Sequence, residues 1–228
     1  MILPAFGASY VPSRVRLILA LAISFAVTPT ITGIPDISTN PAILAYQVFA
    51  EIVIGLMIGT IVKIISAAIH TAGMIMAMQS GLGQAMMFDP NQSSQGAFFG
   101  NFMEVMAIAL MFSLNLHHYM IMGVVSSYEV FPPVPDLPLA AFAETASRTV
   151  AKSFAIGTQI AAPLIIVGLL INLASGLLAR LMPAFQVFFV IMPAQIMLSI
   201  FVFMATLSAG MIWYMGQLQS SLEDFLSF

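Results

Sequence analysis

Residues 176–195 read GLLARLMPAFQVFFVIMPAQ, and the only charge among them is the guanidinium of Arg180. On both sides the chain continues without Lys, Arg, Asp or Glu, over residues 153–179 and 181–222. A soluble domain has no need of so long an apolar run, and a membrane-spanning helix needs about 20 apolar residues. The stretch therefore predicts membrane helices. Arg180, together with Pro183 and Pro193, predicts that these helices are more than plain anchors.

The composition of the whole chain points the same way. Of its 228 residues 61% are hydrophobic and 7% are charged, whereas a soluble domain is about 25% charged. The net charge is −3 and there is no basic run, which argues against nucleic-acid binding. The chain has no cysteine, which excludes disulfides and thiolate metal sites. Arg14 and Arg16 follow the first apolar residues, the reverse of the order in a cleaved signal peptide.

Hydropathy predicts an all-α integral membrane protein with about five to six hydrophobic segments. They cover residues 17–35, 42–66, 67–87, 96–127, 153–178 and 183–218. The polar stretch 88–95 and the proline-rich stretch 131–138 are expected to be loops. Residues 139–152 form a polar, amphipathic element, and residues 220–228 a short acidic tail. Pro193 is expected to bend the last segment.

One face of the second segment carries a glycine and charge pattern. Glu51, Gly55, Gly59 and Lys63 follow one another at intervals of four residues. The glycines allow another backbone to approach closely, and a charge near the bilayer centre costs roughly 2.5–3.5 kcal/mol. Glu51 and Lys63 lie about 18 Å apart along a helix, too far to pair directly. Either this face contacts another helix or subunit, or the two charges lie near helix ends and are hydrated.

The next segment repeats the small-residue spacing at Gly73, Ala77 and Gly81, among several methionines. Methionine is flexible and suits surfaces that deform around varied partners, although ordinary lipid or core packing explains the same pattern. Two later residues, His117 and His118, are adjacent and would point about 100° apart on a helix, which disfavours a shared metal. A helix break with a hydrogen-bonded histidine pair is the preferred interpretation. No nucleophile elbow, paired-carboxylate motif or phosphate loop is visible, so we expect neither an enzyme nor a cofactor.

Four stretches together resemble the FliR family of flagellar export-gate proteins, whose secretion homologues are the SctT proteins. They are LPAFG and VPSRVR at residues 3–7 and 11–16, EIVIGLMIG at 51–59, MQSGLGQAMMFDP at 78–90 and ARLMPAFQVFFVIMP at 179–193. The likeness covers essentially the whole chain, residues 1–228, as one domain. Family members usually carry a further apolar helix before the first motif, which implies that this helix is missing here. They also often have glycine where this chain has Leu116.

The resemblance implies a protein-conducting gate in the bacterial inner membrane, at the flagellar basal body. Such proteins assemble as a single copy with FliP and FliQ subunits into a closed cone of tilted, kinked helical hairpins. The chain would be a FliP-like half followed by a FliQ-like hairpin. Implied partners are also FlhB- and FlhA-type export components, exported flagellar proteins as transient cargo, and membrane lipid. Energy would come from partner proteins and the proton motive force, so no nucleotide site is implied.

The resemblance also places a pore plug near residues 113–126. Its candidate residues are Asn115, His117, His118, Met120 and Met122. Candidate assembly contacts are Glu51, Gly55, Gly59, Arg180, Pro183 and Pro193. One alternative function is a secondary transporter of ions or small molecules that uses Glu51, Lys63 and Glu104, although no inverted repeat is apparent. A second alternative is the SctT subunit of a virulence secretion system.

Overall fold

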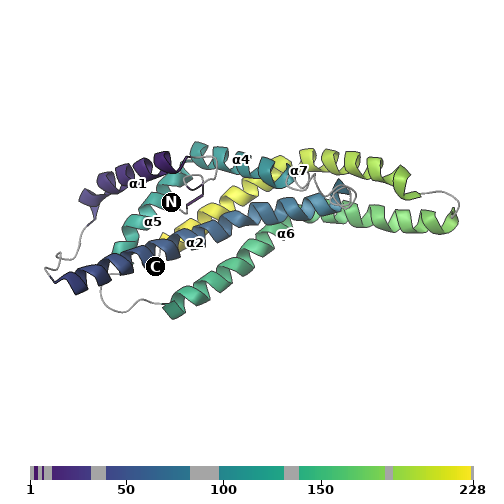
Figure 1. The fold of residues 1–228 in the computed structure, drawn as a ribbon. Helices are drawn as coiled ribbons and strands as arrows, with labels where there is room; N and C mark the ends of the chain where they lie inside the picture. Colours follow the sequence, from purple (N-terminus) through teal and green to yellow (C-terminus); the bar gives the residue numbers. More distant parts are fainter. Residues whose placement is uncertain are drawn as a thin grey trace. The chain divides into compact units, whose positions relative to one another are not determined.

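The computed structural model describes residues 3, 4, 7, 12–31, 40–82, 98–130, 139–182 and 187–226. These residues form helices and turns, without a strand in the described ranges (Figure 1). The elements are α1 (Ser13–Val27), a 3-10 turn η1 (Thr28–Thr30), α2 (Pro41–Gln79), α4 (Phe98–Ser113), α5 (Leu116–Val130), α6 (Leu139–Leu181) and α7 (Val187–Leu226). The prediction of an all-α fold is confirmed.

The described helices also have the length and apolarity of membrane spans. Four of them qualify: Ser13–Thr30, Pro41–Gln79, Leu139–Leu181 and Val190–Glu223. The number rises to five if α4 and α5, which are bent by 75° at a short break, are counted as one broken span. The membrane class is therefore confirmed.

Several predicted boundaries were wrong. Segments 42–66 and 67–87 were expected to be separate, but α2 continues across their boundary as one helix. Ser66 at that point donates a hydrogen bond to the carbonyl of Val62, 3.0 Å away within the same helix. Helix growth is cooperative, and no proline or glycine interrupts the chain there. In the same way, α6 joins the amphipathic stretch 139–152 and the apolar segment 153–178 into one helix. Helix α7 continues beyond residue 218 into the expected acidic tail.

The prolines inside helices are tolerated. Pro163 lies inside α6 and Pro193 inside α7, and both helices continue on either side. A bend at Pro193 stays a prediction. The expected loops 88–95 and 131–138, and Pro183, lie outside the described residues.

The chain divides into two compact units, and α2, α4, α6 and α7 each contribute to both. The first unit comprises Met1–Ser66, Leu110–Lys152 and Leu218–Phe228, and the second comprises Ala67–Ala109 and Ser153–Gln217. In the first unit Ile58, Val62 and Ile65 of α2 are buried, as are Leu116 and Met120 of α5.

The second unit is built on close helix contacts at glycines. A Cβ added to Gly73 in α2 would lie 2.2 Å from the Cα of Gly100 in α4. A Cβ added to Gly157 in α6 would lie 2.8 Å from the carbonyl oxygen of Ala68 in α2. Beside these contacts Phe99 is fully buried, and its ring centroid is 4.8 Å from that of Phe203 in an edge-to-face arrangement. Glycine on both sides allows the two backbones to come so close at Gly73 and Gly100, and glycine on one side allows it at Gly157.

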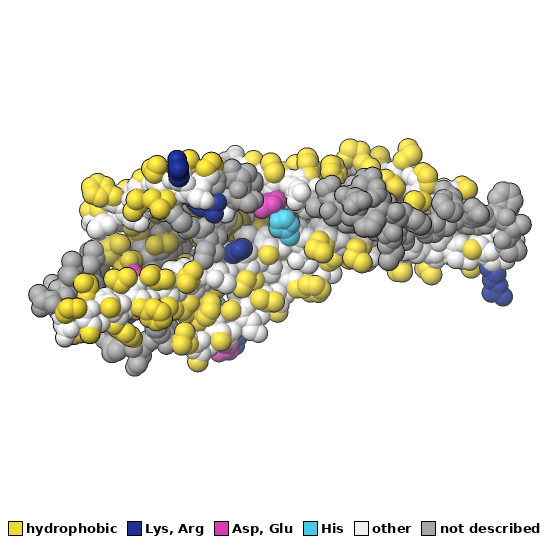
Figure 2. All heavy atoms as spheres, viewed as in Figure 1, with side chains coloured by type: hydrophobic (Ala, Val, Ile, Leu, Met, Phe, Trp, Pro, Cys, Tyr) yellow, Lys and Arg dark blue, Asp and Glu magenta, His cyan; other side chains and the backbone are white. Residues whose placement is uncertain are grey.

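Large apolar side chains are exposed along the long helices. Phe25 is 85% exposed and Leu181 is 76% exposed, and no residue of α1 is buried. Figure 2 shows yellow hydrophobic side chains spread over the visible face, with few charged ones among them. Apolar surface on this scale requires cover by lipid or by other protein chains.

Candidate functional site

The break between α4 and α5 is built on one residue with an unusual backbone. Asn115 has φ of 58°, and it is the one non-glycine residue with positive φ in the described ranges. Its N–H donates to the carbonyl of Phe112 at 3.2 Å, and its own carbonyl accepts from the N–H of His118 at 3.0 Å. Asparagine tolerates this left-handed conformation better than most residues. Asn115 therefore ends one helix and starts the next, and the predicted break is confirmed.

Three rings gather beside Asn115. The ring centroids of Phe112 and His117 are 5.0 Å apart, and those of His117 and His118 are 4.1 Å apart. Nδ1 of His117 is buried and has no hydrogen-bond partner among the described residues. The contact that the structure records between the two histidines is thus a ring contact and not the expected hydrogen bond.

The five candidate plug residues do not all lie on one surface. Asn115 and His118 are exposed, His117 is half-buried, and Met122 is 56% exposed. Met120 is only 2% exposed and belongs to the core of the first unit. Asn115, His118 and Met122 are therefore exposed on this unit, whereas Met120 is packed in its core, and the role of these residues in a plug stays a prediction.

Glu51, Gly55, Gly59 and Lys63 lie on α2 as predicted. Gly59 is buried and Glu51 half-buried, whereas Gly55 and Lys63 are exposed. The hydroxyl of Tyr128 in α5 donates a hydrogen bond to Oε2 of Glu51 at 2.9 Å. Gly59 is buried, whereas a Cβ added to Gly55 would meet no atom within 4 Å. Lys63 is exposed and has no ion-pair partner in the described part of the chain. Glu51 thus has a partner within its own unit, whereas the role of Gly55 as an assembly contact stays a prediction.

Arg180 lies in the last turn of α6, and its side chain is exposed. A cation there complements the negative end of the helix dipole, which is worth about 0.3–1 kcal/mol. Within the described ranges no carboxylate forms an ion pair with Arg180. Pro193 is exposed on α7. These two residues share no contact that the structure records, and their role in assembly stays a prediction.

Two polar contacts of the second unit were missed by the sequence reasoning. Nε2 of His70 in α2 lies 3.1 Å from Oε2 of Glu104 in α4. Nε2 of the buried Gln195 in α7 donates to the backbone carbonyl of Gln79, at the end of α2, at 2.9 Å. A polar side chain inside an apolar segment signals that a partner is needed. That signal was present at all of these positions, but it does not say which helix supplies the partner.

A metal site requires several ligating side chains close together. Groups of three or more His, Cys, Asp or Glu side chains that could bind a metal ion do not occur in the described ranges. The described part of the chain thus combines a span broken at Asn115 with close glycine contacts in the second unit.

Comparison with known proteins identifies the family. A sequence model described as "Bacterial export proteins, family 1" matches residues 1–221. The chain is 35% identical over 215 residues to the flagellar biosynthetic protein FliR of Caulobacter vibrioides, covering 93% of this chain and 86% of that one. It is 32% identical over 200 residues to FliR of Escherichia coli K12, covering 86% and 75%.

A more distant relative is similar over a still longer range. FliR of Aquifex aeolicus is 29% identical over 234 residues, covering 99% of this chain and 87% of the relative. The predicted resemblance to the FliR family is thereby confirmed, with membrane location and a part in flagellum biogenesis and protein export. Since the family match extends over residues 1–221, the chain belongs to the bacterial export proteins, family 1.

Proposed function

We propose that this chain is a membrane subunit of the flagellar type III protein export gate and forms the protein-conducting channel together with FliP- and FliQ-type subunits. The observation that carries the proposal is the broken span at Asn115, in a chain whose family match extends over residues 1–221. A span that breaks within its apolar length exposes backbone and side chains at membrane depth. Such irregular backbone is tolerated where it is covered by protein or lines a cavity.

The surface of the chain supports an assembled role. Exposed apolar side chains occur on all the long helices, so neighbouring subunits and lipid can both be accommodated. We place the chain, as one export-gate domain over residues 1–228, in the bacterial inner membrane at the flagellar basal body. FlhA- and FlhB-type components would be neighbours and exported flagellar proteins the transient cargo. In this role the chain is a conduit and not an enzyme.

The transporter alternative has less support. It would use the carboxylates of Glu51 and Glu104 for a substrate or ion. Glu51 accepts a hydrogen bond from Tyr128, and Glu104 lies beside His70, so each carboxylate already has a partner within its own unit.

Co-purification tests the proposal. The tagged chain, expressed with FliP and FliQ homologues from the same genome, should elute with both as one detergent-stable complex. Cells lacking the chain should fail to export flagellar proteins and recover when it is restored. A chain that purifies alone, while its absence leaves export normal and abolishes uptake of a small solute, would favour a transporter.

Gly55→Leu is expected to lower the yield of that complex about tenfold, if packing of 1–2 kcal/mol is lost. The reason is that Gly55 faces open space in the isolated chain, where only a partner would meet the new side chain. The measurement is the ratio of partner to tagged chain after purification. Ile54→Leu, next to it on α2, is the control and should assemble normally.

Gly59→Leu is a useful contrast because Gly59 is buried within the chain itself. It should lower the yield of folded subunit as well as that of the complex. Equal assembly of Gly55→Leu and Ile54→Leu would mean that Gly55 faces lipid.

Arg180→Ala is expected to reduce assembly and motility. A guanidinium at the end of an apolar helix needs a carbonyl, carboxylate or headgroup partner, and Arg180 is exposed in the isolated chain. The matched control is Arg148→Ala on the same helix, where the arginine is paired with Glu144 in the chain itself. Wild-type complex yield and swimming in Arg180→Ala would show that the residue is dispensable for assembly.

A further inference from the structure

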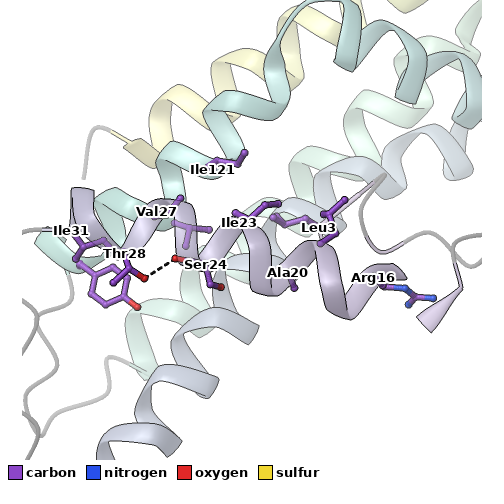
Figure 3. A pocket seen from close by; sticks show the side chains of 12 residues that line it. Leu3, Arg16, Ala20, Ile23, Ser24, Val27, Thr28, Ile31 and Ile121 are labelled. Carbon is purple, nitrogen blue, oxygen red and sulfur yellow. Dashed lines mark hydrogen bonds between the residues drawn. The ribbon is translucent and has the colours of Figure 1, made fainter. Parts of the chain in front are cut away.

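A cavity lies between α1 and α5 in the first unit. Its volume is about 240 Å³. The α1 wall carries Leu19, Ile23 and Val27, and the α5 wall carries Ile121 and Val124. We call this cavity the α1–α5 slot. Figure 3 shows Arg16 at one end of it, Thr28 and Ile31 at the other, and Ile121 facing them from the second helix.

The slot is apolar along its length and charged at one end. The hydroxyl of Thr28 donates to the carbonyl of Ser24 at 2.7 Å, so this polar group is satisfied inside α1. Tyr128 also lines the slot, and its hydroxyl donates a hydrogen bond to Glu51. Arg16 is the one cationic residue among those that line the slot, and Leu3 also lines it. Figure 3 shows the Arg16 side chain extending outward at its end of the slot. Arg14 lies two residues before Arg16 in the chain.

We propose that the α1–α5 slot binds one anionic phospholipid, with its phosphate on Arg16 and an acyl chain between α1 and α5. From Arg16 to Thr28 the helix extends about 18 Å. One leaflet contributes about half of the roughly 30 Å hydrocarbon core. An acyl chain that starts at a headgroup beside Arg16 therefore matches the slot in length.

The arginine end determines which lipid binds. Lipid tails are as apolar as the slot, so burial of the chain alone gives little preference over the surrounding bilayer. A guanidinium forms paired, charge-assisted hydrogen bonds with a phosphate. Arg16 lies in the first turns of a candidate span, where such side chains reach the headgroup level. Net negative lipid is favoured over zwitterionic lipid because no ammonium group competes for the phosphate.

The bound lipid would also support α1. No residue of α1 is buried by the protein. An acyl chain in the slot would contact α1 and α5 at once and thus link them. The inference does not rest on the proposed export role.

Native mass spectrometry of the full-length chain in detergent tests the inference, with phosphatidylglycerol and phosphatidylethanolamine as probes. The chain should retain one phosphatidylglycerol and bind it about tenfold more tightly than phosphatidylethanolamine. Arg16→Ala should remove this preference, whereas Arg148→Ala, an arginine outside the slot, should keep it.

A second pair of variants tests the apolar part. Ala20 lines the slot, and Ala22 on the same helix is exposed and does not line it. Ala20→Phe should lower the retention of both lipids, and Ala22→Phe should leave it unchanged. Circular dichroism confirms that each variant keeps its helix content.

Three results would overturn the proposal. The first is equal retention of the two lipids by the unaltered chain. The second is undiminished lipid binding in Ala20→Phe. The third is a dimer mass that Ala20→Phe abolishes, which would show that a second copy of this chain occupies the slot.

Discussion

Gly73→Ala is expected to disrupt the packing of the second unit. The new Cβ would lie 2.2 Å from the Cα and 2.4 Å from the backbone N of Gly100, so no side-chain rotation can relieve the clash. Overpacking usually costs 1–3 kcal/mol, and a contact between two backbones belongs at the upper end, about 3 kcal/mol. For a chain of this size the midpoint of thermal unfolding in detergent should fall by about 10 °C.

Gly216→Ala is the matched control. It lies inside α7, and an added Cβ there would meet no atom within 4 Å. Alanine improves helix propensity by about 1 kcal/mol over glycine, so this variant should unfold at the same temperature or slightly higher. Indistinguishable unfolding midpoints for the two variants would contradict the close approach of α2 and α4.

The glycine spacing illustrates how far sequence reasoning reaches. The small-residue spacing of Gly73, Ala77 and Gly81 left close helix contact and ordinary packing both open, and Gly73 and Ala77 are buried on α2. Gly81 has a different role, because its φ of 83° lies just beyond the end of α2. Periodicity marks the face of a helix. It does not identify Gly100 as the partner, because that choice depends on which helices pack together.

Polar residues, too, show from the sequence that a contact is needed without showing which residue supplies it. Glu51 was predicted to face protein or water, and the structure gives it Tyr128. Its apolar surroundings made a partner necessary, but Tyr128 is far away in the sequence and has no local signal. The position of the break could be predicted, because Asn115 is a local feature. The continuity of α2 across residues 66 and 67 could not be predicted, because an apolar sequence does not show whether one long helix or two shorter ones form.

Deletion of residues 115–118 is expected to open the assembled gate to ions. Asn115 lies in the break and residues 116–118 begin α5, and Asn115 and His118 are exposed there. In the proposed channel they would close the pore until an exported chain displaces them. The flanking Leu114 and Met122 are exposed. Such apolar and thioether groups exclude ions and still yield to a polypeptide, and the deletion would shift them relative to one another. Conductance of proteoliposomes that contain the assembled complex should rise by roughly an order of magnitude or more.

Point variants at Asn115 separate the shape of the break from its chemistry. Asn115→Gly retains easy access to positive φ, so it should keep the break and the seal. Asn115→Val places a β-branched residue at φ of 58°, where it is strained. It should therefore distort the junction and raise conductance part of the way toward that of the deletion. Each complex must contain the FliP- and FliQ-type subunits in normal ratio before its conductance is compared. An assembled deletion complex as tight as the unaltered one would place the closure in other subunits, and α4 and α5 would then be a bent support for them.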